Sequence, residues 1–199
     1  MSPNSLPDQY GSLSFVMRHK YVTAALVLAR TPFKESAALV TLLTEEFGLV
    51  RARAEGLRKS GAKLAHALQT FDRCEVTLVR GKEGWRLSGA ILEESWFKRL
   101  KRLERMRAGR MAGLLLRLVH GEANDPSLFV LFTEFLEALP ELSEEAQDTA
   151  EIMTALRVLA VLGLDVGVLP HVGIYEPLLS DQRRELVMRV NRGIAASGL

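Results

Sequence analysis

The hydrophobic periodicity of this 199-residue chain changes at about Ser95, and that change limits the folds open to it. From Tyr21 onward, short runs with apolar residues at every second position alternate with turn residues, the pattern of β-strands. After Ser95 the apolar residues recur at the spacing of helix faces. The sequence therefore predicts an α+β protein in which a strand-rich part precedes an all-α helical bundle. We expect a flexible leader at 1–19, a strand domain at 20–94 and a helical domain at 95–199.

Five segments have strand character, and a short helix separates the third from the fourth. The strands are expected at 21–30, 37–46, 49–55, 71–80 and 84–94, and the helix at 62–69. The intervening stretches TPFKES and GKEG are typical of turns. This order of elements is that of an OB-fold, a five-stranded barrel with a helix between its third and fourth strands. A small antiparallel sheet capped by one helix is the alternative.

The third segment, LVRARAE, shows which of its side chains should face the core. Strict alternation places Val50, Ala52 and Ala54 on one face of the strand and Arg51 and Arg53 on the other. We expect the apolar face to be buried and both arginines to point outward.

The second half of the chain predicts four helices. The first is one long helix over 96–121, whose apolar side comprises Leu100, Leu103, Met106, Leu114, Leu115 and Leu118. Asp125 should cap a second helix that Pro140 ends, and Ser143 a third that runs to about Leu164. A last helix should begin with a cap at Ser180 or Asp181. Its apolar positions are Leu186, Val187, Val190 and Ile194.

The net charge of +2 conceals a division along the chain. Residues 1–120 contain 21 Lys or Arg against 11 Asp or Glu, a balance of +10, whereas residues 121–199 contain 5 against 13, a balance of −8. Charge does fluctuate between ordinary domains, but a difference this large favours a basic module that binds an acidic partner.

An OB-fold binds oligonucleotides on the outer face of strands 2 and 3 and at two loops, and cations occur at each of these places. The candidate DNA-binding residues there are Lys34, Arg51, Arg53, Arg58, Lys59, Lys63, Lys82 and Arg86. Phe33 and Trp85 lie among them and are candidates for base stacking, since single-stranded nucleic acid needs both cations and exposed rings. The alternative for Trp85, which alternates in phase with Leu87, is packing in the core. For Phe33 the two alternatives are balanced.

A further basic group, KRLKRLERMRAGR, follows the strands. It places Lys98, Arg99, Lys101, Arg102, Arg105, Arg107 and Arg110 against a single Glu104. An ordinary solvated helix intersperses acidic residues at i, i+4, so we favour a surface that faces a polyanion, with Lys98, Lys101, Arg102 and Arg105 as DNA-binding candidates. The acidic stretch 122–151 contains no Lys or Arg, and we interpret it as a soluble outer face.

The sequence contains no recognisable catalytic or cofactor motif. It lacks a P-loop, a dinucleotide fingerprint and the motifs of serine hydrolases and zinc proteases, so we predict neither enzymatic activity nor a cofactor. The single cysteine, Cys74, shares a strand face with Val76 and Leu78 and is expected to be a core thiol, and no metal site is predicted. No apolar run is long enough to span a membrane, and the first 20 residues do not resemble a secretory signal. We expect a cytoplasmic protein.

Two long stretches of the chain resemble a known family. YVTAALVLARTPFKESAALVTLLTEEFGLVRARAEGLRKS and LQTFDRCEVTLVRGKEGWRLSGAILEE are similar to the amino-terminal domain of the bacterial recombination-mediator family RecO. The order of parts is the same: a strand, a turn with Glu-Ser, a strand ending in TEEFG, a strand ending in Glu-Gly and a basic loop. The later ALRVLAVLGLDVG is similar to a segment of the family's helical domain.

The resemblance implies a DNA-binding protein without enzymatic turnover. Members of the family bind single- and double-stranded DNA, anneal strands, contact the tail of single-stranded DNA-binding protein and, with RecR, help to load RecA at gaps. We accordingly expect this cytoplasmic protein to be nucleoid-associated. The family's basic surface corresponds here to Arg51, Arg53, Arg58, Lys59 and Lys63. Cations that could hold the tail are Arg157, Arg183, Arg184 and Arg189.

The chain departs from the family's pattern in two respects. Many members have four cysteines that form a zinc site after the Leu-Gly segment, whereas DVGVLPHVGIYEPLLS here has none, and the chain is short for the family. Two other functions stay open: a protein-interaction adaptor that uses its basic groups to bind an acidic protein surface, and an RNA-binding barrel.

Overall fold

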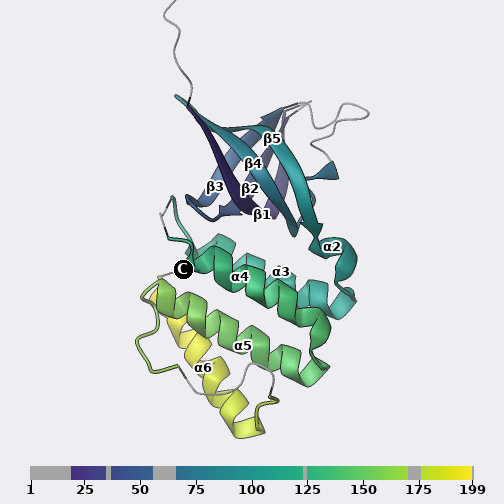
Figure 1. Ribbon diagram of the computed structural model, residues 1–199. Coiled ribbons are helices and arrows are strands. Elements are labelled where there is room, and N and C mark those ends of the chain that lie inside the picture. Colours follow the sequence, from purple (N-terminus) through teal and green to yellow (C-terminus); the bar gives the residue numbers. More distant parts are fainter. Residues whose placement is uncertain (1–18, 35–36, 56–65, 123–124, 170–175, 199) are drawn as a thin grey trace, which may run out of the picture.

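The N-terminal part of the protein is a closed five-stranded barrel, shown in the upper half of Figure 1. The computed structural model describes residues 19–34, 37–55, 66–122, 125–169 and 176–198. The strands are β1 (Lys20–Lys34), β2 (Ala37–Thr44), β3 (Gly48–Glu55), β4 (Asp72–Gly81) and β5 (Gly84–Ser95). They follow one another around the barrel in the order β1, β2, β3, β5, β4, and each neighbouring pair is antiparallel except β3 and β5. This closed order confirms the OB-fold and excludes the open sheet.

The first strand is longer than its sequence predicts. We expected a turn from Thr31, but β1 continues to Lys34, and Thr31 and Pro32 pair with residues of β2. A register shift between Pro32 and Lys34 interrupts the ladder where proline has no N–H to donate. Of the helix predicted at 62–69, residues 62–65 lie outside the described part of the chain.

Strand β1 contributes to two hydrophobic cores at once. Ala25 and Val27 point into the barrel, where they pack in the cluster that contains Val50. Leu26 and Leu28 point to the other side of the strand and pack against the helices. All four side chains are nearly inaccessible to solvent. The almost continuous apolar run in β1 therefore belongs to a strand that is buried on both faces.

The helices form layers below the barrel (Figure 1). They are α2 (Trp96–Arg99), α3 (Arg102–Leu118), α4 (Ser127–Ala138), the short 3₁₀ helix η1 (Leu139–Glu141), α5 (Glu144–Val161) and α6 (Ser180–Ala196). Helices α3 and α4 lie next to the barrel, α5 lies below them, and α6 packs on α5. None of the helices in the described ranges is long and apolar enough to cross a membrane.

The single helix predicted over 96–121 is wrong. The chain leaves the helical conformation at Leu100, whose ψ is 137°, and α3 begins after Lys101, whose backbone N–H donates to the Glu104 carboxylate at 2.6 Å. The break changes the phase of the buried face. Leu103 and Met106, predicted to be apolar contacts, are each 49% exposed, and the buried residues of α3 are Glu104, Ala108, Met111, Ala112, Leu115 and Leu118.

The predicted helix ends are mostly confirmed. Asp125 Oδ1 accepts a hydrogen bond from the Ser127 N–H at the start of α4, and Ser143 Oγ accepts one from Ala146 at the start of α5. Pro140 lies in the 3₁₀ turn that follows α4. The cap of α6 was predicted wrongly: Ser180 is already helical, and the N–H of Leu179 donates to the Gln182 side chain.

Candidate nucleic-acid interface

The outer face of β3 presents arginines, as the alternation predicts. Val50, Ala52 and Ala54 are at most 1% exposed, while Arg51 is exposed and Arg53 is half-buried. Arg53 pairs in register with Leu39 of β2 and Arg86 of β5. Neighbouring positions on adjacent strands put Arg53 and Arg86 side by side on the outside of the barrel.

The guanidinium of Arg53 has an aromatic and an acidic neighbour. Its central carbon lies 4.9 Å from the centroid of the Phe33 ring, and its Nη1 lies 3.1 Å from Oε2 of Glu83 in the β4–β5 turn. Phe33 is 43% exposed. The Phe33 ring, the Arg53 guanidinium and the β4–β5 turn thus lie together on the outside of the barrel, in a region where OB-folds bind their ligands.

The β4–β5 turn borders a groove beside Arg53. Lys82 and Arg86 contribute cations to its lining, and Glu55 and Glu83 contribute carboxylates. Within the described ranges, Arg51, Lys82 and Arg86 make no ion pair. We call Phe33, Arg51, Arg53, Lys82 and Arg86 the barrel surface. Its unpaired cations can neutralise phosphate groups.

Four other predicted cations cannot be placed. Arg58, Lys59 and Lys63 lie outside the described residues, and so does the side chain of Lys34, whose backbone ends β1. The predictions for these residues stay predictions.

Trp85 is packed in the barrel core, which is the alternative to base stacking. It is 8% exposed, and its ring centroid lies 5.4 Å from those of Tyr21 and Phe47. The indole N–H donates to Oε1 of Glu122 at 2.8 Å, and the Arg80 guanidinium lies over the ring at 4.8 Å. The faces of this ring are therefore occupied by protein groups.

Glu122 connects the end of the first long helix to the barrel. It accepts hydrogen bonds from Arg80 and from Trp85, and its backbone forms a bridge with Gly48. Burial acts to raise the pKa of Glu122, but the hydrogen bonds from Arg80 and Trp85 outweigh it and hold the pKa below its usual value. The sequence did not predict this contact, because Glu122 and Trp85 lie 37 residues apart and no local sequence pattern links them.

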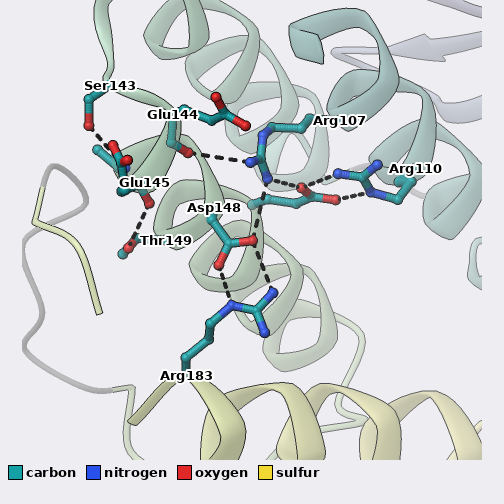
Figure 2. A network of polar contacts seen from close by, with 10 residues as sticks. Arg107, Arg110, Ser143, Glu144, Glu145, Asp148, Thr149 and Arg183 are labelled. Atoms are coloured by element: carbon teal, nitrogen blue, oxygen red, sulfur yellow. Dashed lines mark hydrogen bonds and ion pairs between the residues drawn. The ribbon is translucent and has the colours of Figure 1, made fainter. Parts of the chain in front are cut away.

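The basic group on α2 and α3 divides into two sets. Arg107 and Arg110 bind Glu151 of α5 at 2.8 and 2.6 Å, and Arg99 lies 3.8 Å from Glu141 (Figure 2 shows the α3–α5 contacts). The acidic stretch is therefore not only a soluble outer face, since part of it pairs with the basic helix.

The second set keeps its charge available. Lys98, Lys101 and Arg102 are exposed and have no ion pair among the residues that the structure describes. The guanidinium of Arg105 lies 4.8 Å from the centroid of the Phe97 ring. The four DNA-binding candidates of this group thus gather at α2 and the first turn of α3.

Most of the cations considered for tail binding have acidic partners. Arg183 binds Asp148 at 2.7 Å, Arg189 binds Asp165 at 2.5 Å, and Arg184 lies 3.9 Å from Asp181 (Figure 2 shows Arg183 with Asp148). Arg157 instead lines a groove between α4 and α5 together with apolar and acidic side chains.

Cys74 is confirmed as a core thiol. It is completely buried, and its Sγ donates to the carbonyl oxygen of Ala67. Burial, with smaller contributions from Asp72 and Glu93, raises the pKa of the thiol to about 12. A thiol with that pKa is not a nucleophile at neutral pH.

Comparison with known proteins identifies the barrel. Residues 17–96 match the family model described as recombination protein O, N terminal. A DNA repair protein RecO from Myxococcus xanthus (strain DK1622) is 34% identical over 147 residues, which are 73% of this chain and 59% of that protein. DNA repair proteins RecO from Clostridium novyi (strain NT) and Synechocystis sp. (strain ATCC 27184 / PCC 6803 / Kazusa) are 33% and 32% identical over 55% and 59% of this chain.

The chain spans 59%, 43% and 44% of the length of these three relatives. The matched family model covers the whole barrel, and the relatives' matches continue beyond its length into the helices. Both findings agree with the closed OB-fold order of the strands. This chain belongs to the RecO family.

Proposed function

We propose that this protein is a non-enzymatic DNA-binding recombination mediator of DNA repair. In this proposal it binds single- and double-stranded DNA, promotes the annealing of complementary strands and helps to load RecA on gaps coated with single-stranded DNA-binding protein. The observation that carries the proposal is the barrel surface, where Arg51, Lys82 and Arg86 are left without acidic partners in the described structure and Arg53 lies against the exposed Phe33 ring.

The chemistry of this surface suits an unpaired strand. Cations neutralise phosphates, and an exposed ring offers a face on which a base can stack. The Arg53 guanidinium lies 4.9 Å from the centroid of the Phe33 ring, and the Phe33 side chain is 43% exposed, so a base could reach the ring beside a cation. The names of the relatives, DNA repair protein RecO, point to the same class of ligand.

The binding should depend steeply on salt. About four phosphate contacts on a single strand would lower the affinity by about 50-fold between about 50 and 200 mM salt, because protein binding releases cations condensed on the strand and this release is less favourable at higher salt. Replacing Arg51 and Arg53 together by alanine should weaken binding of an oligothymidine by at least about tenfold and reduce the salt dependence. Glu55, an exposed residue of the same strand, gives a matched control as Glu55→Ala, which should not weaken binding.

A strand-annealing assay tests the activity. The full-length protein should accelerate annealing of complementary oligonucleotides, and should do so on strands coated with single-stranded DNA-binding protein only when that protein keeps its tail. Binding that did not weaken with salt, or that survived the double arginine substitution, would contradict the proposal. Stronger binding to a matched RNA would make RNA the ligand, and protein binding without annealing would make the chain an adaptor.

The partners are proposals of the same kind: DNA, RecR, the tail of single-stranded DNA-binding protein and, indirectly, RecA. For the tail, Arg157 is the candidate, since Arg183 and Arg189 are bound to Asp148 and Asp165. Leu131, Phe135 and Ala138 line the groove beside Arg157 and offer apolar surface. Three carboxylates also line it, those of Glu134, Glu137 and Glu141, so the acidic residues of the tail would have to lie at Arg157. Arg157→Glu should abolish capture by an immobilised tail peptide while oligonucleotide binding stays unchanged.

A further inference from the structure

A second groove lies between β1 and α2. Its lining comprises Arg30, His66, Leu68, Gln69, Thr70 and Phe97. Arg30 is exposed, and among the described residues it has no ion-pair partner. Among the residues that the structure describes, its lining contains no carboxylate, whereas the groove at the β4–β5 turn contains Glu55 and Glu83. Its charge therefore suits an anionic ligand.

Phe97 gives this groove an aromatic wall. The side chain is 41% exposed, although a ring of this size is stabilised by burial. The Arg105 guanidinium lies 4.8 Å from the ring centroid, and the exposed Lys98 follows Phe97 directly in the chain. An exposed ring among cations is the combination with which proteins bind unpaired bases and their phosphates.

We propose that this groove and the Phe97 ring are a second nucleic-acid subsite, which takes the part of a single strand that extends beyond the barrel surface. Phe97 stacks a base, and Arg30, Lys98 and Arg105 neutralise the neighbouring phosphates. The inference rests on the proposed function, since it concerns the same ligand.

The two sites lie toward opposite ends of β5. Arg86 of the barrel surface is near the start of the strand, and Phe97 is two residues beyond its last residue, Ser95. At about 3.3 Å per residue, the strand from Arg86 to Ser95 spans up to about 30 Å. Arg30 of the groove precedes Phe33 of the barrel surface by only three residues in β1, or about 10 Å, so the two sites adjoin at β1 and Phe97 lies at the far end. A ligand that reaches from Arg86 to Phe97 must be longer than one that occupies the barrel surface alone.

The length of the ligand separates this proposal from general DNA binding. The protein and its variants are titrated with fluorescent oligothymidines of about 4 nucleotides, the short end of the range that one OB-fold covers, and of about 30 nucleotides. Phe97→Ala should weaken binding of the longer strand by about tenfold and leave binding of the shorter strand within about twofold. Phe97→Tyr, which keeps the ring, should restore the affinity for the longer strand.

Leu103→Ala is the matched control, because Leu103 is a similarly exposed apolar residue that follows the same helix break. It should change neither affinity, and thermal melting of each variant confirms that the fold is kept. An equal effect of Phe97→Ala on both lengths, or no effect on either, would overturn the inference while the proposed function stands.

Two further results are informative. Failure of both oligonucleotides to bind the unchanged protein would overturn the proposed function and this inference with it. If Phe97→Ala left both affinities unchanged but weakened binding of a peptide of alternating glutamate and leucine, the groove would be a protein-docking site and the inference would be wrong.

Discussion

Arg53 of β3 and Glu83 of the β4–β5 turn form an ion pair, with Nη1 and Oε2 3.1 Å apart, on the face of the barrel that carries the candidate DNA-binding residues. The Glu83 side chain is 81% exposed, and that of Arg53 is 32% exposed. An ion pair at such exposure stabilises a protein by at most about 1 kcal/mol. The Glu83 carboxylate therefore pairs with Arg53 when no ligand is bound, and this pair is weak enough for a phosphate to replace the carboxylate.

Replacing Glu83 by glutamine should tighten binding of a single-stranded oligonucleotide. Releasing Arg53 from an ion pair of about 0.2–1 kcal/mol predicts a rise in affinity of about 1.4- to fivefold at low salt. In an Arg53→Ala background the same substitution should have a smaller effect, which a double-mutant cycle measures. Equal gains in both backgrounds, or an equal gain from Glu55→Gln in the same groove, would show that only the total charge matters.

Replacing Glu122 by alanine should destabilise the fold through Trp85. The buried indole N–H would lose its acceptor, and an unsatisfied buried donor costs about 1–3 kcal/mol. Glu122→Gln keeps an acceptor oxygen and should lower the free energy of unfolding less. Urea unfolding followed by tryptophan fluorescence checks the order. Equal losses for the two variants would show that the hydrogen bond to Trp85 contributes little.

The pH dependence of stability should have a contribution from Asp148. Hydrogen bonds from Arg183, and secondarily the charge and hydrogen bond of Arg107, hold the pKa of Asp148 below its usual value of 3.8 despite partial burial. A lowered pKa in the folded state means that the contribution is complete at neutral pH, and that it is lost as the pH falls below about 4 and through the folded-state pKa.

Asp148→Asn should therefore lower the free energy of unfolding at pH 7 and reduce the loss of stability between about pH 5 and pH 2. Unfolding by urea at a series of pH values measures both effects. Asp181 of α6, whose side chain is 96% exposed and 3.9 Å from Arg184, provides the control for loss of a carboxylate: Asp181→Asn should lower the free energy of unfolding at pH 7 less than Asp148→Asn does. A profile of Asp148→Asn that ran parallel to that of the unchanged protein would refute the assignment.

Gly193 should not tolerate alanine, although alanine favours helices. A Cβ atom there would lie 2.8 Å from Cδ1 of Leu159 and 3.3 Å from the carbonyl oxygen of Leu164, so either the buried Leu159 side chain or α6 would have to shift. We expect a loss of about 1–3 kcal/mol, the usual cost of overpacking. Gly113→Ala in α3, where a Cβ would meet nothing within 4 Å, should instead stabilise the protein by about 0.5–1 kcal/mol. Thermal melting of both variants compares them, and a Gly193→Ala protein as stable as Gly113→Ala would contradict the packing argument.

The barrel was predictable because its signals are local. Alternation assigned Val50 and Ala52 to the core and Arg51 to the surface, and the order of the strands gave the topology. The end of β1 was not predictable, since Pro32 reads as a turn residue and only its pairing with β2 makes it part of the strand.

The helical part was harder to predict for a similar reason. At the break, Leu100 is buried in the core between the barrel and the helices, and Glu104 caps the start of α3. The hydrophobic periodicity of the sequence continues through this position and does not predict the break. The ion pair of Arg110 with Glu151 joins residues 41 apart, so the sequence shows two opposite charges without showing that they meet. For the same reason the sequence did not single out Phe97, which reads as one more apolar residue of a helix.

The two faces of β1 have a thermodynamic consequence. Leu26 and Leu28 each gain about 1.5–3 kcal/mol from burial against the helices, while Ala25 and Val27, next to them in the chain, support the barrel interior. Separating the helices from the barrel would expose the apolar outer face of this strand to solvent. We therefore expect the barrel and the helices to unfold together as one cooperative unit.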